Sequence, residues 1–119
     1  MPELYTSPTR IPVPGGKLIE EHVGRVNSGD ERVSIARMTA PANWSEPFQT
    51  PEFDEWTLVL RGSVHVEHEA GRFEVDAGQT VLTRAGERIR YSCGDDGAEY
   101  VAICLPAFAP GTVNREDEP

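Results

Sequence analysis

The sequence predicts one all-β domain, an antiparallel sandwich or barrel. Short runs of strand-forming residues alternate with turn residues, and no segment keeps a helical period. A chain of 119 residues is long enough to bury one core but not two. We therefore expect a single domain made of short strands.

The turn residues divide the chain into the expected segments and strands, taken in chain order. Residues 1–16 carry four prolines and predict an extended N-terminal segment outside the middle of any sheet, because proline cannot donate a ladder hydrogen bond. We expect residues 17–108 to form the barrel domain and residues 109–119 to form an acidic tail. We expect Gly94-Asp95-Asp96-Gly97 to form a hairpin turn. The predicted strands cover residues 17–26, 32–39, 53–60, 63–68, 72–75, 80–83, 88–93 and 99–105.

Two of these strands carry apolar residues on both faces. In the run 56–60, Trp56 and Leu58 alternate with Thr57 and Val59, and residues 100–105 behave in the same way. A strand with one solvated face would alternate polar and apolar residues instead. In a domain this small, the second apolar face predicts a homodimer.

Charge and composition exclude several classes of partner. Twenty Asp and Glu against eleven Lys and Arg leave no basic surface for phosphates, so we expect neither a nucleic-acid nor a membrane partner. Part of the acidic excess lies in a solvated tail, 115–119. The N-terminus has no apolar run and the two cysteines, Cys93 and Cys104, are too few for a disulfide framework, which predicts a cytoplasmic protein.

Two segments carry a family resemblance. In 49–62, Glu55 lies seven residues before Gly62, and this resembles the first motif of the cupin superfamily, in which two histidines precede the Glu. Gln49 and Pro51 stand at those histidine positions. The run 78–86 resembles the second motif, with Ile89 at the position of its histidine.

The resemblance covers residues 18–105 and implies a jelly-roll barrel of two antiparallel sheets around a ligand cavity. A narrower resemblance is to metal-independent cupins that dehydrate a uridine 5′-aldehyde in pacidamycin biosynthesis. It rests on Lys17, the run 88–91 and the run 106–108. This chain departs from that pattern at Ser45-Glu46, where a histidine is expected, and at Glu55, which replaces a tyrosine.

Strand parity predicts which side chains share the cavity. If Glu55 points inward, Phe53, Thr57 and Val59 do so too, and Tyr91 follows Ile89. We predict Glu55 as the general acid or base, Tyr91 as a proton donor and Lys17 as an electrostatic clamp. The substrate-binding residues predicted beside them are Gln49, Phe53, Thr57, Ile89 and Trp44. The structural alternative is that Glu55 forms a salt bridge with Arg37, Arg88 or Arg90.

No metal or other cofactor is expected. His65 and His68 are three residues apart on a strand and project to opposite faces, and His22 lies on another strand. The leading hypothesis is a metal-independent lyase or isomerase acting on a small polar molecule. The alternatives are a non-catalytic small-molecule binding module and a cupin whose metal is held by Glu55, Gln49 and Glu46.

Overall fold

The computed structural model describes residues 1–117, so Glu118 and Pro119 of the expected acidic tail lie outside the described residues. All seven strands pair antiparallel, in the order β1-β2-β3-β7-β4-β5, with β6 paired to β4. The only helical element described is a short 3-10 turn, η1. The elements are β1 (Thr9–Ile11), β2 (Leu18–Val23), β3 (Ser34–Ala40), β4 (Asp54–His68), β5 (Gly71–Asp76), β6 (Thr80–Thr83), β7 (Arg90–Leu105) and η1 (Pro110–Thr112).

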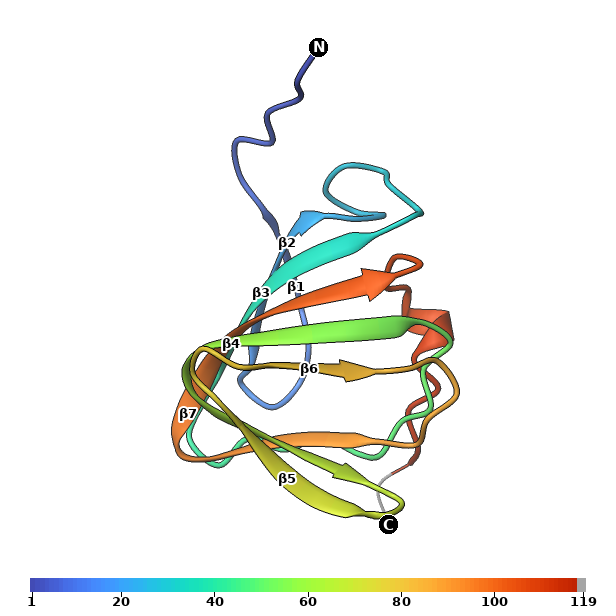
Figure 1. The fold of residues 1–119 in the computed structure, drawn as a ribbon. Helices are drawn as coiled ribbons and strands as arrows, with labels where there is room; N and C mark the ends of the chain where they lie inside the picture. The colour runs from blue at the N-terminus through green and yellow to red at the C-terminus, as the bar shows by residue number, and fades with distance from the viewer. Residues whose placement is uncertain (118–119) are drawn as a thin grey trace.

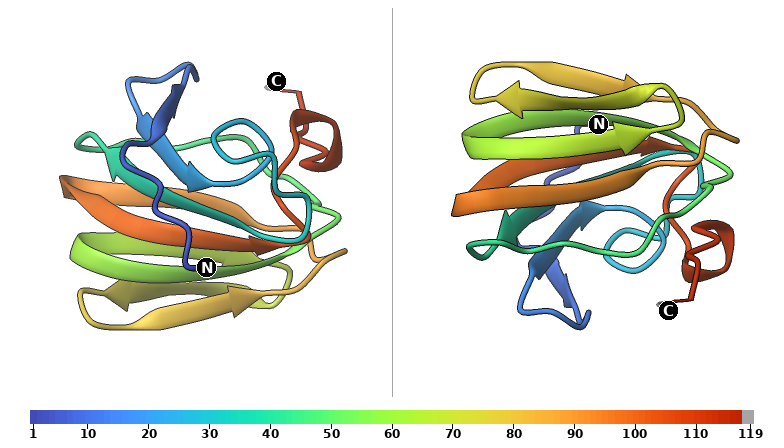
Figure 2. Two further views of the ribbon diagram at one scale, coloured as in Figure 1. Left: turned by 90° about the horizontal axis from the view of Figure 1, so that it is seen from above. Right: turned by 90° about the horizontal axis from the view of Figure 1, so that it is seen from below.

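Two long strands build both layers of the barrel. The first half of β4 pairs with β6 and with the second half of β7, whereas its second half pairs with β5 and with the first half of β7. Figure 1 shows the two halves of β7 at different levels, and Figure 2 shows the layers from above and below. The predicted all-β jelly-roll fold of two antiparallel sheets is confirmed.

The expected hairpin turn at residues 94–97 is wrong. Gly62 pairs with Ala98 and Val64 pairs with Cys93, so residues 94–97 bulge out of a strand that continues past them. Gly62 and Gly97 both have positive φ, 71° and 66°. A Cβ on Gly62 would lie 2.2 Å from the Gly97 carbonyl oxygen, so the two strands can approach this closely only at glycine. The predicted runs 53–60 and 63–68 belong to one strand, β4, because its pairing with β7 continues on both sides of the bulge.

Inward side chains fill the barrel, and several outward ones stay apolar. Val59 is fully buried on the inner face of β4, and Tyr100 is buried on the inner face of β7. On the opposite faces, Leu58, Leu60 and Leu105 are 36%, 47% and 47% exposed. The two-faced apolar pattern is therefore present in the structure, while the homodimer that it suggests stays a prediction.

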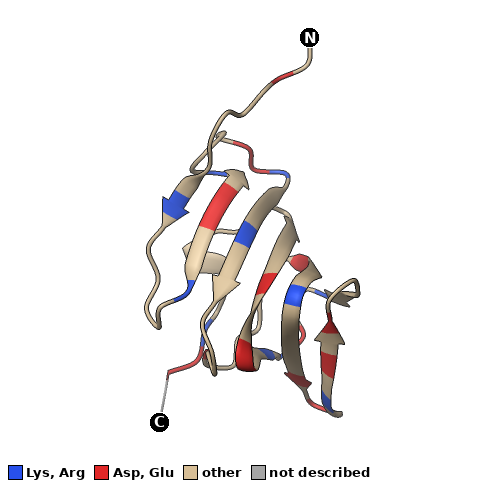
Figure 3. Cartoon of the chain, turned by 90° about the vertical axis from the view of Figure 1, so that its left-hand side faces the viewer, with Lys and Arg blue, Asp and Glu red and all other residues tan. Residues whose placement is uncertain are grey.

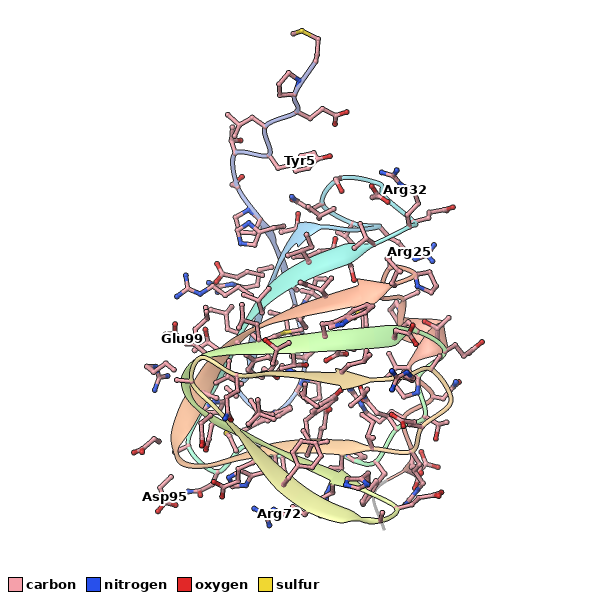
Figure 4. All side chains as sticks on the ribbon, in the orientation of Figure 1. Tyr5, Arg25, Arg32, Arg72, Asp95 and Glu99 are labelled. Carbon is pink, nitrogen blue, oxygen red and sulfur yellow. The ribbon has the colours of Figure 1, made fainter. Side chains whose placement is uncertain are left out.

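Many charged side chains lie on the outer faces and ends of the strands, whereas Glu21 and Glu55 point inward. Figure 3 shows acidic and basic positions interspersed along them, and Figure 4 shows labelled examples such as Arg72 and Glu99 pointing away from the barrel. Glu99 accepts a hydrogen bond from Arg37 on the neighbouring strand, with an Nη2–Oε2 distance of 2.8 Å. No helix among residues 1–117 has the length and apolar character needed to cross a membrane.

Candidate functional site

A cavity of about 260 Å³ lies between the two layers of the barrel. Of the predicted site residues, Glu55, Tyr91, Lys17, Gln49 and Phe53 line it. A second hollow of about 320 Å³ adjoins it and shares Lys17 in its wall. The strands that contribute residues to the main cavity are β1, β2, β3, β4 and β7.

The structure places the other three predicted residues differently. Thr57 and Ile89 are buried in the core and do not line the cavity. Thr57 instead donates a hydrogen bond to Glu55 Oε2 at 3.1 Å, so it orients that carboxylate from behind. Trp44 lines the adjoining hollow. Parity alone cannot separate a cavity wall from the packed core beside it, because both lie on the inner face.

Glu55 projects from β4 without an ion pair. Its carboxylate accepts the Thr57 hydrogen bond and faces the Cys104 thiol, whose Sγ lies 3.6 Å from Oε1. Among residues 1–117, no Lys, Arg or His nitrogen lies within 4.0 Å of it. Within the described part of the chain, Glu55 therefore forms no salt bridge of the kind that a purely structural role would require.

The three arginines considered for that alternative bind other carboxylates. Arg37 pairs with Glu99, Arg88 with Glu116, and Arg90 with Glu67. All of these pairs lie outside the cavity wall.

Lys17 enters the cavity from the segment before β2. Gly15 and Gly16 both have positive φ, 86° and 78°, and this backbone conformation turns the chain just before Lys17. The Lys17 ammonium lies 4.3 Å from the centre of the Trp44 ring and 5.4 Å from that of Tyr100. The two aromatic faces stabilise a cation that has lost part of its water.

Glu46 and Arg115 form the rim between the cavity and the adjoining hollow. Arg115 Nη2 lies 3.2 Å from Glu46 Oε2 and 3.3 Å from Gln49 Oε1. Gln49 also forms isolated β-bridges to Ile89 and to Arg115, so the C-terminal segment runs beside residue 49 as part of the rim. Glu46 and Arg115 line both hollows.

Burial shifts the pKa values of the groups in the cavity. Loss of solvation raises the pKa of the Glu55 carboxyl, an effect that the nearby Lys17 charge opposes. Loss of solvation likewise raises the pKa of Glu46, with Lys17 and Arg115 opposing. The pKa of Lys17 is lowered by the same desolvation, with Glu46 and Glu55 acting against it. The cavity thus holds two carboxyls and one amine whose pKa values move toward neutrality, a pattern typical of acid–base sites.

Tyr91 stays neutral in this surrounding. Its hydroxyl is 2.6 Å from Thr83 Oγ1 in a buried hydrogen bond. Desolvation, and then the Glu55 charge, raise the pKa of the Tyr91 phenol well above its ordinary value. Tyr91 can therefore donate a hydrogen bond, but it does not act as a phenolate.

Sequence reasoning missed several cavity residues. Local composition places Arg115 in a solvated tail, and strand parity marks Tyr100 only as part of an apolar face, yet both line the cavity. Glu21 was not among the predicted site residues, but it is 2% exposed and accepts hydrogen bonds from the amides of Val26 and Asn27, at 3.0 and 2.8 Å. The only signal for Glu21 is its parity with Ile19, which a mixed polar run obscures.

The histidines lie outside the cavity wall. His65 lies 3.3 Å from Glu74 across the β4–β5 ladder, and the His68 ring packs near Phe73. Within residues 1–117, no group of three or more His, Cys, Asp or Glu side chains is placed to hold a metal ion.

Comparisons with solved structures define the class of fold as the cupin type. A single-substitution variant of oxalate decarboxylase from Bacillus subtilis superposes with a TM-score of 0.77 at 17% identity, covering 93% of this chain and 31% of that one. A conserved protein of unknown function from Streptococcus pyogenes superposes with a TM-score of 0.67 at 14% identity, covering 82% and 80% of the two chains. At these identities the likeness concerns the fold alone.

The sequence is also similar to that of a named protein. The chain is 42% identical over 107 residues to a protein of Myxococcus xanthus called endoribonuclease YbeY. The match covers 89% of this chain but 36% of the relative, so the chain spans about a third of that protein's length. No family model matches the sequence.

This relative contradicts the function predicted from sequence. We expected a lyase, isomerase or binding module for a small polar molecule, with no nucleic-acid partner, whereas the relative is named for RNA cleavage. The expectation from charge was wrong because net charge describes the whole surface. Arg88 and Arg90 nevertheless gather around one aromatic ring, that of Phe48, beside the cavity rim.

Proposed function

We propose that this chain takes part in RNA processing, and that its cavity is an acid–base site for cleaving an RNA phosphodiester bond. The observation that carries the proposal is the Glu55 carboxylate, which has no ion pair, a raised pKa and a place in one cavity with Lys17 and Tyr91. The name of the Myxococcus xanthus relative supports RNA as the substrate class. The narrower sequence resemblance, to cupins acting on a uridine 5′-aldehyde, stays a prediction, and it agrees with the proposal only in that uridine is a component of RNA.

The proposed reaction needs no added reactant. Glu55, as carboxylate, accepts the proton of a ribose 2′-hydroxyl, and the 2′-oxygen forms a bond to the adjacent phosphorus. The bond from phosphorus to the 5′-oxygen breaks, and that oxygen receives a proton from protonated Glu46. The products are a 2′,3′-cyclic phosphate and a 5′-hydroxyl. Lys17 stabilises the negative charge that develops on the phosphate oxygens.

The geometry suits a nucleotide turned out of its strand. Double-stranded RNA cannot enter a barrel, whereas a single-stranded nucleotide can be splayed away from its neighbours. Aromatic side chains wall the cavity and its neighbour, among them Tyr100, Phe53 and Trp44, and such faces stack on bases. Lys17 and Arg115 lie at the rim, where the phosphates of the strand would remain.

A second candidate is an RNA-binding domain that serves a nuclease located elsewhere. The observation that favours it is coverage, because about two thirds of the relative lies outside the match and can carry the cleavage activity. In that case the cavity holds the nucleotide and Glu55 takes no part in chemistry.

The test is cleavage of a single-stranded RNA, labelled at its 5′ end, by the purified chain. We expect wild-type protein to yield products ending in 2′,3′-cyclic phosphate and Glu55→Gln to lose at least about 100-fold in kcat. Glu74→Gln is the matched control, because Glu74 lies on β5 with 59% of its side chain exposed. RNA binding without cleavage would overturn the catalytic proposal in favour of the second candidate, and absence of both binding and cleavage would overturn both.

A further inference from the structure

Two arginines flank an aromatic ring on the outer surface beside the cavity rim. The guanidinium carbons of Arg88 and Arg90 lie 3.9 and 4.8 Å from the centre of the Phe48 ring. Gln49 and Ile89 face each other across a β-bridge and are both buried, so the residues next to them point outward. Phe48, Arg88 and Arg90 are called here the arginine–phenylalanine cluster.

The C-terminal segment covers this cluster with a carboxylate. The Glu116 amide donates to the Phe48 carbonyl oxygen at 2.8 Å, which fixes the segment beside the cluster. The Glu116 carboxylate accepts two hydrogen bonds from Arg88, from Nε at 2.6 Å and from Nη2 at 2.9 Å. Arginine binds a phosphate group through the same two-bond fork. Both side chains are nearly half exposed, so another anion can exchange with Glu116.

The same segment connects the cluster to the cavity. Arg115 precedes Glu116 and lines the cavity, where it contacts Glu46 and Gln49. Adjacent residues therefore face opposite sides of one rim, with Arg115 toward the cavity and Glu116 toward the cluster. A nucleic-acid strand with one nucleotide in the cavity would place its next phosphates along the rim.

We propose that the arginine–phenylalanine cluster is the subsite for the RNA backbone next to the cavity, and that Glu116 is a built-in competitor for the phosphate site on Arg88. This inference rests on the proposed function, and it adds a binding surface and its regulation. RNA displaces the Glu116 carboxylate and takes over the two donors of Arg88. Arg90 binds Glu67 through a single carboxylate oxygen, Oε1, and adds a second positive charge to the subsite.

Equilibrium binding of a fluorescein-labelled single-stranded oligoribonucleotide, followed by anisotropy at several salt concentrations, tests this. We expect Arg88→Gln to weaken binding about fivefold and to reduce the slope of log affinity against log salt by about 1. Arg72→Gln is the control, because it removes an exposed arginine of β5 outside the cluster. Glu116→Gln should tighten binding by more than Asp95→Asn, which removes one negative charge from the 94–97 bulge, where Figure 4 shows Asp95 pointing outward.

Each outcome decides one part of the inference. Unchanged binding by Arg88→Gln overturns the subsite, even if the chain cleaves RNA and Glu55→Gln abolishes cleavage. Equal effects of Glu116→Gln and Asp95→Asn overturn the competitor role. A wild-type chain that binds no RNA overturns the inference together with the proposed function. In the cleavage assay, Arg88→Gln should raise KM with kcat unchanged. Glu55→Gln should lower kcat with KM unchanged.

Discussion

Replacing Glu55 with glutamine separates a catalytic from a structural role through stability alone. Glutamine keeps a side-chain oxygen that can accept the Thr57 hydrogen bond, so the local contact at 3.1 Å survives. The Lys17 ammonium retains a neighbouring carboxylate in Glu46, whose charge also acts on it. The substitution removes the titratable charge and the acceptor of the weak contact from the Cys104 thiol.

The expected change in stability has a definite sign. Burial raises the pKa of Glu55 in the folded protein above its ordinary value of 4.5, so between the unfolded and the folded pKa the folded state holds more protons than the unfolded state. Wild-type stability then falls as pH rises through this window, by about 1.4 kcal/mol for each pH unit that separates the two pKa values. Glu55→Gln lacks this loss. We expect it to match wild type near pH 4 and to melt at an equal or higher temperature at pH 8.

A structural salt bridge predicts the opposite result. Removing one partner of a buried ion pair costs about 3–5 kcal/mol. For a domain of this size, that loss lowers the melting temperature by roughly 10 °C or more. Thermal melts of wild type, Glu55→Gln and Glu46→Gln at pH 4 and pH 8, followed by circular dichroism, measure the difference. A drop of this size for Glu55→Gln at pH 8 would refute the assignment of Glu55 as a free acid or base.

Two further predictions concern the charge in the cavity and the bend of the barrel. Lys17→Met removes a charge that lowers the pKa of Glu55, so the acidic limb of the pH–rate profile should move to higher pH, whereas Lys17→Arg should leave it nearly in place; an unshifted limb in Lys17→Met contradicts the coupling. Gly62→Ala should destabilise the protein by at least about 2 kcal/mol in urea unfolding, because its Cβ would meet the Gly97 carbonyl and its φ is 71°. Gly29→Ala has a similar φ of 75° and open space around it, so it should cost only about 1 kcal/mol, and equal losses for the two variants would rule out the close contact as the cause.

The all-β fold and much of the cavity wall could be predicted from sequence because they depend on local signals. Turn residues mark the ends of the strands, and two-residue periodicity places Glu55 and Phe53 on one face. The bulge at 94–97 was mistaken for a hairpin because two glycines and two aspartates suit either structure. Only the pairing of β7 with β4 on both sides of the bulge decides between them, and that pairing is a long-range property.

The rim of the cavity could not be predicted for a related reason. Arg115 and Glu46 are 69 residues apart in sequence and meet because the C-terminal segment returns to pair with Gln49. Charged residues near a terminus are usually solvated, so local composition indicated a tail. Net charge gave no hint of the RNA-cleaving activity in the name of the Myxococcus xanthus relative, because it says nothing about where arginines gather.

The passage of β4 and β7 through both layers also has a consequence for local opening. Both strands cross from one layer to the other at the bend where Gly62 and Gly97 meet. The two layers therefore cannot separate while the pairing of β4 with β7 stays intact. Amide protons in the middle of β4 and β7 should therefore exchange with solvent only through global unfolding. The edge pair β1–β2, which holds the approach to Lys17, can fray independently at much lower free energy. Exchange rates would then report access to the cavity separately from stability of the domain.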